Sequence, residues 1–231
     1  MTALQPFGPG IWTAEGPVVS FLGFAYPTRM AAIRLANRDL FVWSPIRLTP
    51  ALKAEVDTLG RVAHLLSPNK LHHLYLGEWK TAYPDARLYA PPGLARKCRN
   101  LHFDAALGDA PEPAWAADID QARMGGSFAM TEIVFFHRES RTAIFADLVQ
   151  NFPPGWFKGW RGLVARLDGI TASDPGAPRE WRFSFRNRKS ARQALARILG
   201  WRPEQVVIAH GDMVREDGTA FIRKAFRWLA H

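Results

Sequence analysis

Short apolar runs recur along the chain, and most are bounded by turn-forming residues or by helix starts. Their length suits buried strands, because a membrane-spanning helix needs about 18 consecutive apolar residues. Segments with helical spacing separate the later runs. We therefore expect an α/β fold in which helices cover sheets. The expected strands lie at residues 18–21, 30–35, 40–43, 62–66, 87–90, 130–136, 142–145 and 206–209.

Three segments carry helix signals. Thr49 followed by Pro50 is a typical helix start, since Thr caps the first turn and Pro suits its first position. Ser190 and Gln193 match a capping box ahead of an apolar stripe. Residues 221–229 place apolar side chains on one face and basic ones on the other.

Two stretches lack such patterns. Residues 93–122 are expected to be largely loop, and residues 151–160 an irregular aromatic loop. The aromatic side chains of residues 156–160 have two interpretations. They pack over the sandwich or a pocket, or they insert into a membrane interface or a partner protein.

The composition predicts one domain over residues 1–231. An apolar content of 48% is enough for a core, and no Gly/Ser linker divides the chain. The single Cys98 excludes an internal disulfide framework and fits a reducing compartment. The N-terminus lacks the pattern of a signal peptide. We therefore expect a cytoplasmic protein.

The formal net charge is +9, and much of the excess lies in residues 179–197. A solvated basic surface explains this segment, and so does an anionic or nucleic-acid partner. No recognition-helix, ribonucleoprotein or zinc-finger pattern accompanies the charge. Charge alone therefore assigns no function.

Candidate metal ligands follow three of the apolar runs. His72 and His73 come after residues 62–66, Asp147 after residues 142–145, and His210 after residues 206–209. Strand ends hold such groups rigidly while the loops above stay open. Imidazole and carboxylate together match zinc, iron or manganese better than calcium. The alternative is that the histidines are ordinary loop residues and that Asp147 caps a helix.

The order of these motifs resembles the metallo-β-lactamase superfamily, in particular an uncharacterised bacterial branch. The resemblance is carried by PNKLHH (68–73), by ADL (146–148) and by IAHG (208–211), and it covers nearly the whole chain. It implies a four-layer αββα sandwich with the site at one edge of the two sheets.

The chain departs from the superfamily's first motif, His-x-His-x-Asp-His. Pro68 and Lys70 occupy its first two His positions, and residues 124–127 lack the His of the third motif. The resemblance therefore implies an empty first metal position and one divalent ion, zinc before iron or manganese, at the second. Its implied ligands are His72, His73, Asp147 and His210. Lys70 either replaces the first ion electrostatically or is a surface lysine.

Other polar residues have structural interpretations. His64 is expected to pack within a strand, and His137 to hydrogen-bond within a hairpin. Ser44 lies where many relatives have a structural Asp, and its hydroxyl can still hydrogen-bond to the site. Glu78 is either a general base or a helix-packing residue.

Three functions remain open from the sequence. The first is a metal-dependent hydrolase of a small, anionic substrate. The second is a binding or regulatory protein that has lost its catalytic metals. The third is a nucleic-acid-associated protein that uses the basic segment 179–197.

Overall fold

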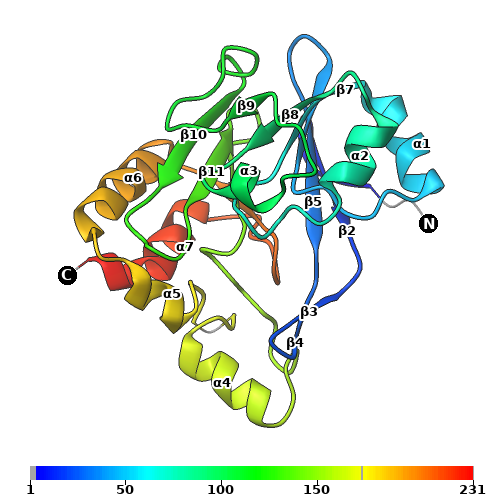
Figure 1. Ribbon diagram of the computed structural model, residues 1–231. Coiled ribbons are helices and arrows are strands. Elements are labelled where there is room, and N and C mark those ends of the chain that lie inside the picture. The colour runs from blue at the N-terminus through cyan, green and yellow to red at the C-terminus, as the bar shows by residue number, and fades with distance from the viewer. Residues whose placement is uncertain (1–3, 173, 231) are drawn as a thin grey trace.

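The computed structural model describes residues 4–172 and 174–230, which form two main sheets flanked by helices (Figure 1). The first sheet has seven strands and is antiparallel from its β1 edge to β6, then parallel to β9. Its strand order is β1 (Gln5–Gly8), β2 (Ile11–Glu15), β5 (Arg29–Arg34), β6 (Asp39–Trp43), β7 (Arg61–Leu66), β8 (Arg87–Ala90) and β9 (Ala105–Ala106).

The second sheet has four strands, and its last two are parallel. Its order is β10 (Ile119–Met124), β11 (Glu132–His137), β12 (Thr142–Phe145) and β13 (Gln205–Ile208). A separate hairpin joins β3 (Val19–Phe21) to β4 (Phe24–Tyr26).

Three apolar clusters define the layers. The inner cluster lies between the sheets and includes Phe41 and Phe135, whose rings meet edge to face at 5.3 Å. The second covers the outer face of the first sheet with α1 (Pro50–Leu59), α2 (Leu76–Ala82) and α3 (Leu94–Lys97). The third covers the second sheet with α6 (Arg188–Gly200) and α7 (Gly218–Ala225). The fold is therefore the expected αββα sandwich.

The remaining helices are α4 (Trp160–Asp168), α5 (Arg179–Ser184) and a 3-10 turn, Arg227–Leu229. Within the described ranges, no helix combines the length and apolarity that a bilayer span requires.

Local signals placed one helix start correctly and another wrongly. The Thr49 side chain accepts a hydrogen bond from the Leu52 backbone N–H, which confirms it as the cap of α1. Helix α6 begins two residues before Ser190, and its cap is Asn187, which accepts from the Ser190 N–H. The predicted capping box was therefore wrong, because the turn before it already supplies a side-chain acceptor.

The weakly patterned residues 93–122 are not simply a loop, because they contain α3 and β9, and β10 begins at Ile119. Gln121 is buried in this strand, and its amide group accepts from the Trp115 indole N–H and donates to the Gly108 carbonyl. A buried amide with tertiary partners breaks the apolar alternation that would have revealed the strand. Similarly, Trp160, the last residue of the expected aromatic loop, is the first residue of α4.

Candidate metal centre

Two of the candidate ligands follow parallel neighbouring strands in the second sheet. Phe145 of β12 pairs with Ile208 of β13, and Asp147 and His210 each lie two residues beyond that pair. The strand register therefore brings these side chains to the same edge. His72 reaches them from the loop after β7 in the facing sheet.

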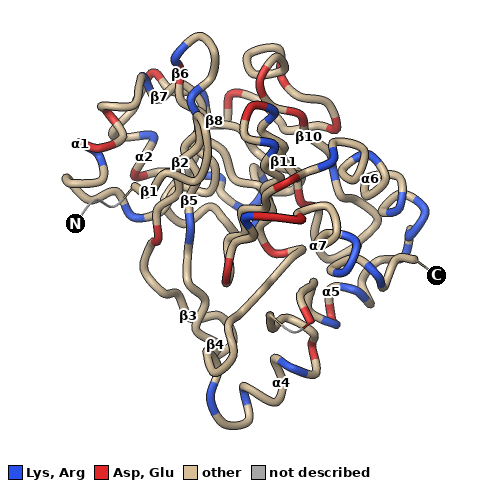
Figure 2. The backbone as a smooth tube through the Cα atoms, turned by 180° about the vertical axis from the view of Figure 1, so that it is seen from behind, with Lys and Arg blue, Asp and Glu red and all other residues tan. Residues whose placement is uncertain are grey.

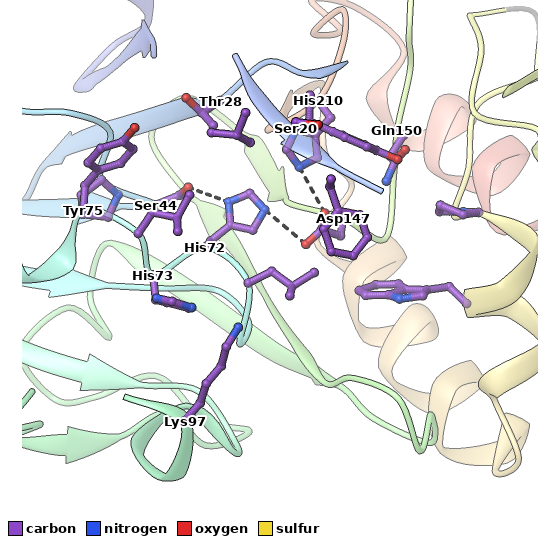
Figure 3. A pocket seen from close by; sticks show the side chains of 18 of the residues that line it. Ser20, Thr28, Ser44, His72, His73, Tyr75, Lys97, Asp147, Gln150 and His210 are labelled. Carbon is purple, nitrogen blue, oxygen red and sulfur yellow. Dashed lines mark hydrogen bonds and ion pairs between the residues drawn. The ribbon is translucent and has the colours of Figure 1, made fainter. Parts of the chain in front are cut away.

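The imidazoles of His72 and His210 converge on the Asp147 carboxylate, as Figure 3 shows. His72 Nε2 lies 3.2 Å from one carboxylate oxygen, and His210 Nε2 lies 3.1 Å from the other. Each residue offers one ligand atom to a group whose members lie within 4.8 Å of one another. All three side chains are largely buried.

His73, the fourth expected ligand, lies outside this group. It lines the same cavity, and Figure 3 shows its ring on the side of Lys97, apart from Asp147. Burial lowers the pKa of His73, and the nearby Lys97 ammonium lowers it further. The structure thus brings together three of the four residues implied by the resemblance.

Each imidazole has a second partner on its other nitrogen. His210 Nδ1 donates to the Pro27 carbonyl at 2.7 Å, which turns Nε2 towards the centre. His72 Nδ1 lies 2.8 Å from Ser44 Oγ, as expected for that serine. The Ser44 backbone has a φ of 50°, in the left-handed region.

Two buried residues that the sequence did not indicate support Asp147. The Glu132 carboxylate accepts from the backbone N–H groups of Ala146 and Asp147, both at 2.9 Å. The Asn69 amide donates to Glu132 at 3.0 Å and to Asp147 at 2.7 Å. An Asn in a loop and a Glu opening a strand carry no local signal of this role.

The two carboxylates respond differently to burial. Burial raises the pKa of Glu132, and the Asp147 charge raises it further. Burial alone would also raise the pKa of Asp147, but His72 and His210 outweigh it and hold that pKa well below its usual range. The centre therefore favours an ionised Asp147, the form that binds metal.

The donor set fits a divalent metal ion. A tetrahedral ion bound at 2.0–2.1 Å sets its ligand atoms about 3.3 Å apart. One ligand atom from each of the three residues lies within 4.8 Å of the others, so modest side-chain movements would bring these atoms to that spacing around an ion. Two imidazoles and a carboxylate are also the usual protein ligands of catalytic zinc sites.

Lys70 has a hydrogen-bond partner within the chain. Its ammonium donates to the Ala129 carbonyl, and the side chain is partly buried. Its amine is thus bonded to the loop that precedes β11, so it is not a free surface lysine, and the electrostatic replacement of an ion by Lys70 stays a prediction.

A cavity of about 310 Å³ opens onto the centre. Its wall is mostly apolar or aromatic, and among the described residues that line it the charged ones are Lys97, Glu180 and Asp147. Tyr26 belongs to this wall, and its ring packs edge to face on His210 with centroids 5.0 Å apart. Other residues that line the cavity include Val19, Ser20, Phe21, Leu71, Tyr75 and Trp181.

The other singled-out residues have structural partners. His64 is buried in β7 beside the Tyr89 hydroxyl at 3.1 Å, and His137 Nδ1 lies 2.8 Å from Ser140 Oγ. These contacts confirm the predicted packing and hairpin roles. Glu78 accepts from the Leu48 backbone N–H and so ties α2 to the preceding loop.

Comparison with solved structures shows the same fold over nearly the whole chain. DIM-1 metallo-β-lactamase exposed to ceftazidime matches with a TM-score of 0.67 and 14% identity, over 98% of this chain and 95% of the other. A metallo-β-lactamase from Pontibacter korlensis matches with a TM-score of 0.64 and 10% identity, over 99% of this chain and 98% of the other. The metallo-β-lactamase FIM-1 from Pseudomonas aeruginosa, in its mono-zinc form, matches with a TM-score of 0.62 and 11% identity, over 98% of this chain and 94% of the other.

Sequence comparison gives a narrower assignment. No curated protein matches this chain significantly. The model of the family described as Domain of unknown function (DUF4336) matches residues 10–158, which include His72, His73 and Asp147. The chain is a member of the DUF4336 family, built on the metallo-β-lactamase fold.

Proposed function

We propose that this protein is a hydrolase that uses one divalent metal ion, zinc before iron or manganese, to act on a small molecule. The convergence of His72, Asp147 and His210 at the floor of a cavity carries the proposal. The mono-zinc form of the Pseudomonas aeruginosa protein supports a single ion, because it has the same fold.

His72, Asp147 and His210 would hold a divalent ion, which would supply Lewis acidity towards a carbonyl or phosphoryl oxygen and favour hydrolysis near neutral pH. The chain's own groups prepare that site. The Pro27 carbonyl holds His210 through Nδ1 and leaves its Nε2 facing the centre, and Ser44 orients His72. Asn69 and Glu132 hold the Asp147 carboxylate and its backbone in place.

The cavity favours a substrate with an apolar body and an anionic group. Leu71, Tyr75 and Trp181 provide apolar surface, whereas Lys97 provides a positive charge at the side where His73 lies. Pockets of this kind bind through apolar contact and use a few polar groups for orientation. Esters, thioesters and phosphodiesters with a negative charge are therefore the first substrates to test.

The test measures zinc content and hydrolysis together. After zinc loading and removal of free ion, the wild type is expected to retain about one zinc per chain. Asp147→Asn and His210→Gln should lose zinc and all hydrolysis of the ester panel. His73→Gln is the matched comparison, since His73 lines the same cavity outside the ligand group. Zinc retention by Asp147→Asn would contradict the proposal, and zinc loss by His73→Gln would add His73 as a fourth ligand.

A second candidate function is a binding or regulatory protein without catalysis. It is favoured by Pro68 and Lys70, which stand where two ligands of the first metal position are usual, and by the Lys70 bond to Ala129. Folded protein that neither retains zinc nor hydrolyses any member of the panel would favour this function.

The basic segment 179–197 gives less support to a nucleic-acid function. Arg182 donates to the Ala177 and Asp168 carbonyls, Arg192 donates to the Leu229 carbonyl, and Arg197 pairs with Asp109. Part of its charge therefore serves contacts within the chain rather than a phosphate-binding face.

A further inference from the structure

An exposed apolar surface covers the β3–β4 hairpin and the adjacent helix α4. Leu22 at the tip of the hairpin is 84% exposed, and Trp160 at the start of α4 is 60% exposed. Large apolar side chains exposed in a group usually mark an interaction site. This hairpin–α4 surface consists of Val18, Phe21, Leu22, Trp160, Leu163 and Leu167.

The hairpin and α4 are packed together as one unit. Figure 1 shows them next to each other, at the end of the molecule beyond the sheets. The Trp156 indole N–H donates to the Ala25 carbonyl at 2.9 Å. Phe24 meets Phe157 and Trp160 edge to face, with ring centroids 5.4 and 5.7 Å apart. The surface is therefore held by a small aromatic cluster of its own.

Helix α4 turns its apolar stripe outwards. Trp160, Leu163 and Leu167 have the i, i+3, i+7 spacing of one helix face, and all three are more than half exposed. The buried side of the helix is instead provided by Ala165. In α6 the apolar face is buried, as is usual for a helix that covers a sheet.

Within the two segments that form this surface, the charges have one sign. Residues 16–28 contain no charged residue, and residues 153–167 contain Lys158, Arg161 and Arg166 but no Asp or Glu. Lys158 and Arg166 are exposed. Figure 2 shows the blue segments of this end of the chain around the uncharged hairpin. Asp168 is the nearest acidic residue of α4, at its C-terminal end.

We propose that the hairpin–α4 surface docks on a lipid bilayer that contains anionic lipids. Trp, Phe and Leu beside Lys and Arg match the interfacial region of such a bilayer, where apolar groups enter and basic groups meet headgroups. A second copy of the same surface is a poorer partner, because a two-fold contact would bring Lys158, Arg161 and Arg166 together with their equivalents.

Docking would bring the mouth of the cavity to the bilayer. Phe21 belongs to the hairpin–α4 surface and also lines the cavity, together with its neighbours Val19 and Ser20. The proposal does not depend on metal binding or hydrolysis, since it rests only on this surface.

The test is co-sedimentation of the full chain with vesicles of phosphatidylcholine alone or of equal parts phosphatidylcholine and phosphatidylglycerol. We expect binding to the anionic vesicles and much weaker binding to the neutral ones. Lys158→Glu with Arg166→Glu should weaken binding by about thirtyfold or more, because each basic residue near the bilayer surface raises the affinity about fivefold. Leu22→Ser with Leu163→Ser and Leu167→Ser should also weaken it, through loss of apolar insertion.

Arg188→Glu with Lys189→Glu is the matched control, since it makes the same change in net charge at exposed positions on α6. Its affinity for the anionic vesicles should stay within about threefold of the wild-type affinity, because salt screens charges that lie far from the bilayer. Thermal unfolding checks that each variant is folded, and the charge variant still tests the proposal if the triple Ser variant is not.

Absence of binding to anionic vesicles would overturn the proposal, as would equal weakening by the α6 control. A dimer that the triple Ser variant abolishes, without vesicle binding, would assign the surface to a second copy instead.

Discussion

Asp147 is ionised in a buried place because its neighbours offset the cost of losing water. Two imidazole nitrogens and the Asn69 amide surround its two oxygens. Hydrogen bonds and positive charge stabilise a buried carboxylate more than burial destabilises it when they are this close. The same contacts place the imidazoles where a metal ion would need them.

Ser44→Ala is expected to lower zinc affinity by about 10- to 100-fold, because the His72 ring loses the partner that orients it. Competition with a chromogenic chelator measures the affinity. Ser20→Ala is the control, since Ser20 lines the same cavity, and its affinity should stay within about threefold of the wild type. Wild-type affinity in Ser44→Ala would show that packing alone orients His72.

His64 should make stability depend on pH. Burial lowers the pKa of His64 from 6.5 to about 4, so between these values the unfolded chain binds a proton that the folded chain does not. The contribution of His64 to stability is therefore present above pH 6.5 and is lost as the pH falls towards 4, by up to about 3 kcal/mol.

Urea unfolding at a series of pH values measures this effect. His64→Gln should remove that part of the pH dependence. His102→Gln changes an exposed position, and its plot of unfolding free energy against pH should run parallel to that of the wild type. An unchanged slope in His64→Gln would mean that other groups cause the acid sensitivity.

Elements with complete local signals formed where the sequence predicted them. Thr49 and Pro50 start α1, and the apolar runs around them form β6 and β7. Such signals are predictable because capping and proline geometry involve only adjacent residues. By contrast, β10 could not be predicted from its own residues, because its Gln121 is buried through hydrogen bonds to Trp115 and Gly108, which lie outside the strand. Helix α4 could not be predicted either, because its apolar stripe is exposed to solvent.

Asn187→Ala should destabilise the protein by about 1 kcal/mol, because the N-terminus of α6 loses its side-chain cap. Gln193→Ala, at an exposed position of the same helix, should change stability by less than about 0.5 kcal/mol. Chemical denaturation of both variants measures the difference. A larger loss in Gln193→Ala would restore the capping box that the sequence suggested.

At the scale of the whole molecule, the candidate metal centre joins the two sheets. His72 follows a strand of one sheet, whereas Asp147 and His210 follow strands of the other. An ion bound by all three would therefore hold the layers together and would bind only the folded chain.

Saturating zinc is expected to raise the melting temperature. At a hundredfold excess over the Kd the gain is about 2.7 kcal/mol, which corresponds to roughly 5–10 °C for a chain of this size. Differential scanning calorimetry measures the shift, and a chelator should reverse it. Asp147→Asn should show no shift, and an equal shift in that variant would place zinc elsewhere.

The sequence by itself indicated α1, β6, β7, β12 and β13 and placed the candidate metal ligands after strands, because these features follow from local patterns; it did not indicate β1 or β2. That residues 1–231 form one domain stays a prediction. The tertiary structure decided which ligands meet. Of two adjacent histidines, His72 faces Asp147 and His73 lies towards Lys97, because successive side chains leave a loop in different directions. It also brought Asn69 to Asp147, a contact between residues 78 positions apart in sequence that no local pattern encodes.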